Sequence, residues 1–272
     1  MFSVALCQIK VALNMDENIQ NAYDKIAEAS KMGASIAALG EMFNCPYSGD
    51  YFSDYAEEEG KSRAVKMLRD ASRKYGIYVV GGSIPEKENG QVYNTSYVLN
   101  PKGEICGKHR KIHLFDVDIK GGIRFKESDY LSSGDKITIF DTPYGKAGVC
   151  ICYDIRFPEL IRSMVLMGAE IVFVPAAFNL TTGPVHWHTL FKARAMDNQV
   201  YMLGISPARD YDGVYKAYGH SIAVNPWGEV ICEAGEPEEI ILADIDLRLE
   251  KKIREELPLL KHRKPEIYIN SR

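Results

Sequence analysis

Several features that mark whole classes of protein are missing from this sequence. No run reaches the roughly 18 apolar residues of a membrane-spanning helix. The first 20 residues have no basic start and only a short apolar run, and acidic residues follow, so we expect no secretory signal. The formal net charge of −4 and the absence of a basic stripe argue against a nucleic-acid partner. We therefore expect a cytoplasmic protein that binds neither membranes nor nucleic acids.

Metal-binding patterns are also missing. The sequence has no CxxC pair and no HExxH, and His186 and His188 are only two residues apart, which places them on different sides of a helix. Six cysteines are scattered through the chain without paired spacing. In a protein of this size without a signal peptide, such cysteines are expected to be reduced thiols. We expect no metal and no disulfide framework.

Short apolar strands alternate with amphipathic helices, and no linker or change of composition interrupts them. This pattern predicts one layered α/β domain over residues 1–272, with a polar tail from about residue 257 to 272 as a possible interface arm. Strands are expected near residues 2–9, 35–39, 77–82, 83–87, 92–99, 136–141, 146–152, 171–175, 200–206, 219–225, 229–233 and 239–244. Helices are expected near residues 16–32, 53–75, 157 onward, 185–199 and 246–256, and residues 100–135 are expected to be mostly loop.

The segment AGVCICYDIRFPEL places Cys152 between a strand and a helix that begins near Phe157. A thiol at the carboxyl end of a strand lies where α/β sheets build their sites, and a nearby helix N-terminus favours a thiolate. The backbone N–H of Tyr153 could then face a substrate oxygen. The simpler alternative is a buried core cysteine, which fits Cys150 better because it lies inside the expected strand.

Two further segments contain charged residues beside apolar strands. Glu41 directly follows an apolar strand in AALGEMFNCPYS, and a buried carboxylate needs a partner. Lys111 belongs to the basic stretch GKHRKIHLFDVDI. Taken singly, Glu41 could form an ordinary salt bridge, and Lys111 could lie in a solvated loop.

Together the three segments resemble the nitrilase superfamily of carbon–nitrogen hydrolases, with GEMF, HRKIHLFD and CYDIRFPEL in the family's order and spacing. The resemblance implies a four-layer α-β-β-α sandwich that pairs into a homodimer or a higher homo-oligomer, and it implies no cofactor. It also implies that Cys152 is the nucleophile, that Glu41 is the general base, and that Lys111 and the Tyr153 N–H hold the oxyanion. Glu127 matches a further acidic position, which would orient Lys111 or the substrate.

Other stretches, KESDYLSSGD, FNLTTGPVHW, ARAMDNQVY and SPARD, are similar to omega-amidases within that superfamily. Those enzymes hydrolyse the terminal amide of short keto acid amides such as 2-oxoglutaramate and 2-oxosuccinamate. The similarity implies that Arg156 grips the substrate carboxylate, because a guanidinium can donate to both of its oxygens. The backbone of Phe178 and the hydroxyl of Thr182 would assist, and Phe115 and Tyr47 would line the pocket. A surface or interface salt bridge is the alternative for Arg156.

Three other functions stay open at this point. The chain could be another amidase of the superfamily, such as an N-carbamoyl or aliphatic amidase. It could be a non-catalytic binding protein on the same fold, although Glu41, Lys111 and Cys152 are all present. A Cys–His glutaminase or protease would need a histidine beside Cys152, and no histidine stands in a recognised context for that role.

Overall fold

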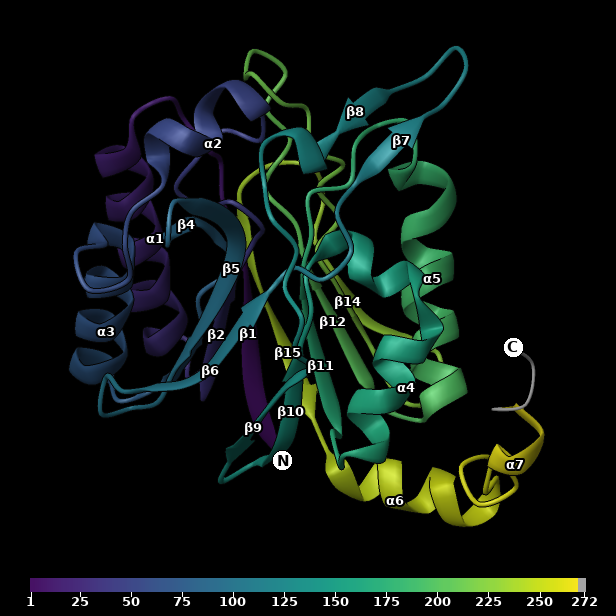
Figure 1. Ribbon diagram of the computed structural model, residues 1–272. Helices are drawn as coiled ribbons and strands as arrows, with labels where there is room; N and C mark the ends of the chain where they lie inside the picture. Colours follow the sequence, from purple (N-terminus) through teal and green to yellow (C-terminus); the bar gives the residue numbers. More distant parts are fainter. Residues whose placement is uncertain (269–272) are drawn as a thin grey trace.

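The computed structural model describes residues 1–268, and its centre is a pair of mixed β-sheets packed face to face (Figure 1). One sheet has the order β15-β1-β2-β3-β5-β4, with β6 added to β5, and the other has the order β14-β13-β12-β11-β10-β9. The strands of the first sheet are β1 (Phe2–Gln8), β2 (Ile36–Leu39), β3 (Tyr78–Val80), β4 (Ile84–Glu88), β5 (Gln91–Leu99), β6 (Ile105–Arg110) and β15 (Glu239–Ile245). Those of the second are β9 (Thr138–Thr142), β10 (Gly145–Val149), β11 (Ile171–Pro175), β12 (Tyr201–Ile205), β13 (Ile222–Val224) and β14 (Val230–Glu233).

Helices cover the outer face of each sheet (Figure 1). The helices α1 (Met15–Lys31) and α3 (Arg63–Tyr75) pack on the first sheet, and α4 (Pro158–Leu166) and α5 (Gly183–Asn198) pack on the second. A third apolar layer, from Val4 and Leu6 to Phe173 and Leu203, fills the space between the two sheets. The predicted α/β fold with four layers, α-β-β-α, is confirmed.

The expected helix over residues 53–75 is wrong, because two helices occupy this part of the chain. The first is α2 (Gly49–Tyr55), and α3 begins anew after Ser62, whose hydroxyl accepts a hydrogen bond from the Val65 N–H. Between them Glu57 pairs with Glu86 of β4 in an isolated bridge. That bridge holds the backbone extended, so a continuous helix cannot pass through it.

Residues 100–135 also contain more regular structure than expected. The strand β6 pairs with β5, and β7 (Asp116–Asp118) pairs with β8 (Arg124–Lys126) in a separate hairpin. A short 3-10 helix, η1 (Glu127–Asp129), follows the hairpin. The alternating exposure along these charged strands, with few apolar residues, explains why the sequence pattern indicated a loop.

The boundary of β10 bears on the site. The strand was expected to reach residue 152 but ends at Val149, and the chain then enters the 3-10 helix η2 (Cys152–Arg156). The Cys150 N–H still donates to the Phe173 carbonyl at 3.1 Å, so the chain follows the sheet for one more residue. Cys152 therefore lies in a turn beyond the strand.

At its C-terminal end the described chain contains α6 (Leu247–Glu256), which follows β15 and lies at the ends of the strands, and the short α7 (Pro265–Tyr268) (Figure 1). Leu247 still packs against the apolar layer between the sheets. The predicted arm over residues 257–272 extends into residues 269–272, which lie outside the described part of the chain. None of the helices described over residues 1–268 is long and apolar enough to cross a membrane.

Candidate active site

Glu41 follows β2 and is held by three donors. Its Oε1 accepts hydrogen bonds from Lys111 Nζ at 3.0 Å and from Asn94 Nδ2 at 2.9 Å. Its Oε2 accepts one from the backbone N–H of Ala177 at 2.8 Å, and Ala177 follows β11 of the other sheet. The side chain is only 1% exposed. A carboxylate fixed on both oxygens keeps one orientation, as a general base requires.

Lys111 is fully buried and lies between two carboxylates. Its Nζ donates to Glu41 Oε1 and lies 2.9 Å from Glu127 Oε2 and 3.0 Å from Glu127 Oε1. Glu127 is itself oriented, because its Oε2 accepts the Phe115 N–H at 2.6 Å and its Oε1 accepts the Tyr47 hydroxyl at 3.1 Å. The structure thus brings Glu127 into contact with Lys111, which is one of the two partners that the family resemblance implies for it; its role stays a prediction.

The charges in this group do not balance, and the pKa values reflect that. Burial raises the pKa of Glu41, and Lys111 opposes the rise, while the carboxylate of Glu127 adds to it, so the pKa of Glu41 stays above its ordinary value. Burial lowers the pKa of Lys111, but Glu127 and Glu41 outweigh burial and raise it well above its usual range. Lys111 therefore stays protonated at neutral pH. Glu41 is a stronger base than an ordinary glutamate.

Cys152 has an unusual backbone. Its φ of 48° is in the left-handed region, which residues other than glycine, asparagine and aspartate rarely adopt. Such conformations persist where the surrounding structure enforces them, and they gather at functional sites. The conformation turns the chain sharply at the end of β10 and presents the thiol at the edge of the sheet, where the strand carboxyl ends meet.

Cys152 as a whole residue is only 5% exposed. Burial and then the neighbouring Glu41 carboxylate raise its pKa well above the ordinary value, against the opposing effect of Lys111. The resting group is therefore a thiol that needs a base to become a nucleophile. Cys150 is fully buried among apolar residues of the second sheet and its helices, in agreement with its interpretation as a core cysteine.

A small cavity opens onto Cys152, and all the residues expected to bind the substrate line it. The lining residues are Tyr47, Phe115, Cys152, Tyr153, Arg156, Ala177, Phe178, Asn179 and Thr182. The edge-to-face contact of Phe115 with Tyr153, with ring centroids 5.1 Å apart, forms part of the wall. The cavity therefore combines aromatic walls with one cation.

That cation is Arg156, at the end of η2. Its guanidinium lies over the Phe178 ring at 4.9 Å and the Tyr153 ring at 5.7 Å, and its Nη1 is 3.1 Å from His186 Nδ1. No carboxylate within residues 1–268 forms an ion pair with it. Burial lowers its pKa, although an arginine stays protonated at neutral pH. Arg156 is therefore a half-buried cation that lies over two aromatic rings and forms no ion pair with a described carboxylate.

The neighbouring segment after β11 supplies polar groups. The Thr182 hydroxyl lies 3.3 Å from Asn179 Oδ1, which also accepts the backbone N–H of Thr182 and of Thr181. The Phe178 carbonyl accepts the Tyr218 N–H at 2.7 Å, so that carbonyl is already used within the protein. The roles given to Thr182, Phe178 and the Tyr153 N–H stay predictions.

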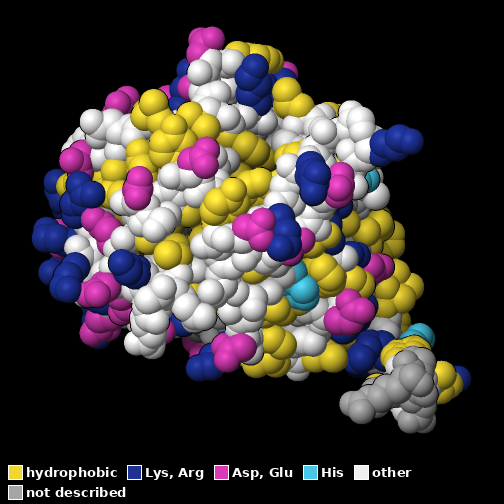
Figure 2. Space-filling model, turned by 45° about the horizontal axis from the view of Figure 1, so that its top comes forward, with side chains coloured by type: hydrophobic (Ala, Val, Ile, Leu, Met, Phe, Trp, Pro, Cys, Tyr) yellow, Lys and Arg dark blue, Asp and Glu magenta, His cyan; other side chains and the backbone are white. Residues whose placement is uncertain are grey.

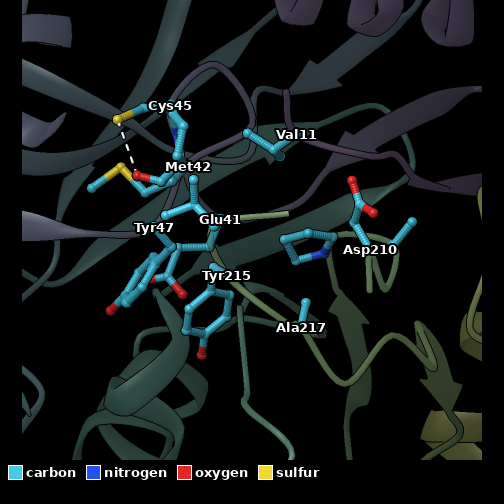
Figure 3. A pocket seen from close by; sticks show the side chains of 12 residues that line it. Val11, Glu41, Met42, Cys45, Tyr47, Asp210, Tyr215 and Ala217 are labelled. Atoms are coloured by element: carbon cyan, nitrogen blue, oxygen red, sulfur yellow. Dashed lines mark hydrogen bonds between the residues drawn. The ribbon is translucent and has the colours of Figure 1, made fainter. Parts of the chain in front are cut away.

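A second cavity adjoins Glu41 and is lined in part by Val11, Tyr47, Asp210 and Tyr215. Tyr47 and Tyr215 lie side by side next to Glu41, with ring centroids 5.0 Å apart (Figure 3). The Tyr215 hydroxyl donates to the Ala177 carbonyl at 2.6 Å. These two rings line the second cavity next to Glu41.

Seen from the end at which α2, β7 and β8 lie, the surface mixes hydrophobic and charged side chains (Figure 2). Charge therefore does not dominate this face, unlike the stripe expected of a nucleic-acid interface. Within residues 1–268, no three His, Cys, Asp or Glu side chains come close enough to hold a metal ion.

Sequence reasoning missed Asn94, Ala177 and Tyr215. Asn94 begins the polar run Asn-Thr-Ser in the middle of β5, between apolar and aromatic residues, and all three residues are buried. Polar side chains in a buried strand need hydrogen-bond partners that are also buried and polar. This signal in the sequence could have pointed to Asn94. Ala177 acts through its backbone, which no side-chain pattern can indicate.

Comparison with known proteins identifies the family. The family model of the carbon–nitrogen hydrolases matches residues 3–255. The omega-amidase NIT2 of Xenopus tropicalis is 49% identical over 268 residues, covering 98% of this chain and 96% of that protein, and human omega-amidase NIT2 is 46% identical with the same coverage. The crystal structure of Saccharomyces cerevisiae Nit3, a member of branch 10 of the nitrilase superfamily, superposes with a TM-score of 0.89 at 42% identity, covering 97% of this chain and 96% of that one. The chain belongs to the carbon–nitrogen hydrolase family.

Proposed function

We propose that this protein is an omega-amidase, which hydrolyses the terminal amide of a short keto acid amide such as 2-oxoglutaramate to the acid and ammonia. The observation that supports it most is Arg156, a half-buried cation without an acidic partner in the described chain, in the same cavity as Cys152. The relatives named omega-amidase NIT2 support the same substrate class.

The first half-reaction forms a thioester. Glu41 takes the proton of the Cys152 thiol, and the sulfur attacks the amide carbon. The carbonyl oxygen becomes an oxyanion between Lys111 and the Tyr153 N–H. When the intermediate collapses, the carbon–nitrogen bond breaks and Glu41 returns its proton to the departing nitrogen, so that ammonia leaves.

The second half-reaction releases the acid. Glu41 removes a proton from water, which attacks the thioester carbon, and the carbon–sulfur bond breaks. The proton returns to the sulfur, so Cys152 ends as a thiol. Glu127 serves both halves, because its two carboxylate oxygens, 2.9 and 3.0 Å from Lys111 Nζ, hold that cation in place.

Substrate choice tests the proposal directly. A forked contact between Arg156 and a carboxylate contributes about 1.5–3 kcal/mol. Arg156→Met should therefore lower kcat/KM on 2-oxoglutaramate by about 10- to 150-fold, since 1.36 kcal/mol is a factor of ten. Ammonia release is the measurement. A small neutral amide or ester should lose little, because it never uses the contact.

The same panel separates the alternatives. Equal losses on charged and neutral substrates would show that Arg156 supports the fold, and the protein would then be a generic amidase of its family. If the wild-type protein prefers an N-carbamoyl compound to 2-oxoglutaramate, the proposed substrate class is wrong and the protein is an N-carbamoyl amidase.

We also propose that the protein is a cytoplasmic homodimer. All six cysteines are free, in agreement with a reducing compartment. Exposed Leu166 and Met167 at the end of α4 and exposed Met196 on α5 give the outer helices of the second sheet apolar side chains that a second copy could cover.

A further inference from the structure

The carboxylate of Asp154 lies two residues beyond the nucleophile and is fully buried. It accepts four hydrogen bonds, two on each oxygen. Oδ2 accepts the Ile151 N–H at 2.9 Å and faces His109 Nε2 at 3.0 Å. Oδ1 accepts the His113 N–H at 2.9 Å and faces His113 Nδ1 at 2.8 Å. A carboxylate with four donors has no free lone pair, so its position is fully determined.

These donors come from the two segments that must cooperate in catalysis. Ile151 directly precedes Cys152, whereas His109 and His113 stand two residues before and two residues after Lys111. Asp154 therefore holds the nucleophile turn with one oxygen and grips the lysine segment on both sides of Lys111. Because β6 belongs to the first sheet and β10 to the second, the contact also joins the two sheets.

Both histidines are fixed by further contacts. His109 is fully buried, with its Nδ1 3.3 Å from the hydroxyl of Thr138. The His113 ring stacks on Phe157, with centroids 3.6 Å apart and planes at 10°. Since an ionised carboxylate only accepts, His109 Nε2 and His113 Nδ1 each carry a proton.

We propose that Asp154 is a positioning residue that keeps Lys111 in register with Cys152, through His109 and His113 on one side and the Ile151 N–H on the other. The proposal rests on Cys152 being the nucleophile of the proposed function. Burial raises the pKa of Asp154, but the hydrogen bonds from His109 and His113 outweigh it and keep the pKa below its usual range. The group is therefore ionised whenever the enzyme works, and it accepts all four bonds.

The test replaces Asp154 by asparagine, which keeps the shape but puts an amide NH₂ against two donors. An error of about 1 Å in a reacting group costs on the order of 10² in rate. Asp154→Asn should lower kcat on 2-oxoglutaramate about 100-fold and leave KM within about threefold, because Arg156 is untouched. Alkylation of Cys152 by iodoacetamide, followed by mass spectrometry, should slow about tenfold, since the thiol loses its alignment with Glu41.

Two controls separate positioning from folding. Glu250→Gln changes another buried acidic side chain, on α6 and outside the site, and should leave kcat and the alkylation rate within about threefold of wild type. His113→Asn keeps a side-chain donor toward Asp154, whereas His113→Leu keeps only bulk against Phe157. The asparagine variant should retain at least tenfold more kcat than the leucine variant.

The proposal is wrong if Asp154→Asn keeps kcat and alkylation near the wild-type values, or if the two His113 variants are equally active. A loss of activity that merely follows the fraction of folded protein, measured by circular dichroism, would also overturn it. If the wild-type protein does not act on 2-oxoglutaramate, the substrate assignment fails, but the alkylation rates still decide the role of Asp154.

Discussion

At the scale of single residues, Cys150 and Cys152 are close in the sequence but lie in different surroundings. Cys152 lies in the strained turn beside Glu41 and Lys111, whereas Cys150 lies in the core. Cys152→Ala should abolish turnover, and Cys150→Ala should keep most of it. Mass spectrometry of the protein quenched during turnover should find the acyl group on Cys152. An acyl group on Cys150, Cys45 or Cys7 would contradict the assignment.

As the proposed base, Glu41 is expected to set the acid side of the pH profile. Only its ionised form can accept the Cys152 proton, and burial, aided by Glu127, keeps its pKa above the ordinary 4.5. As the pH falls, the base is therefore lost earlier than an ordinary glutamate would be, and kcat/KM should drop with a midpoint above 4.5. Initial rates across the acid range, with recovery checked after return to neutral pH, measure this midpoint.

A variant at Glu127 makes the same prediction sharper. Because the Glu127 charge raises the pKa of Glu41, Glu127→Gln should move the midpoint to lower pH even though the rate itself falls. A midpoint that stays in place, or that moves upward, would show that another group controls the acid side.

The site residues divide into those that a sequence can and cannot predict. Glu41, Lys111 and Cys152 could be predicted because each stands in a short sequence motif whose residue types fit a catalytic role. The direction of the Glu41 pKa shift could not be predicted, because it depends on how fully Lys111 and Glu127 are buried with it. The donor from Ala177 arises only when two sheets meet.

At the scale of single elements, the close approach of α5 to β12 depends on one glycine. A Cβ on Gly204 would lie 2.4 Å from Cζ of Phe191, inside any allowed contact. Gly204→Ala should lower the free energy of unfolding by about 1–3 kcal/mol, because the Phe191 ring must shift within a packed core. Urea unfolding measures this loss.

The matched control is Gly60→Ala, which adds a Cβ with nothing within 4 Å. That change should be neutral or slightly stabilising, because alanine restricts the unfolded chain. Equal effects of the two changes would mean that the contact with Phe191 does not limit the packing.

Strands and helices were predictable where local signals agree. Asn14 caps α1 by accepting the N–H groups of Asp16 and Glu17, and asparagine is among the residues preferred at that position. Asn89 and Gly90 both have positive φ in the turn between β4 and β5. The break before α3 was missed because it depends on the bridge from Glu57 to Glu86, a partner 29 positions away. Long-range pairing leaves no local trace.

For the whole molecule, the assembly is the main prediction. A homodimer through α4 and α5 would cover the exposed apolar residues on those helices. Sedimentation velocity at micromolar concentration should give the mass of two chains of 30.5 kDa each. Leu166→Glu together with Met196→Glu should shift the protein toward monomers, because buried unpaired carboxylates are costly. A wild-type monomer would refute this assembly.

The left-handed backbone at Cys152 has a consequence for the history of such enzymes. Any residue with a Cβ is strained there by about 1–2 kcal/mol, and glycine is not. Selection for stability alone therefore favours replacing Cys152, while selection for turnover opposes the change if Cys152 is the nucleophile, as proposed. In a lineage that is no longer selected for catalysis, this position should be among the first to be substituted by glycine. A relative with glycine at the position of Cys152, but with the glutamate and lysine that match Glu41 and Lys111, would be a protein that has lost its activity. That one residue would identify it.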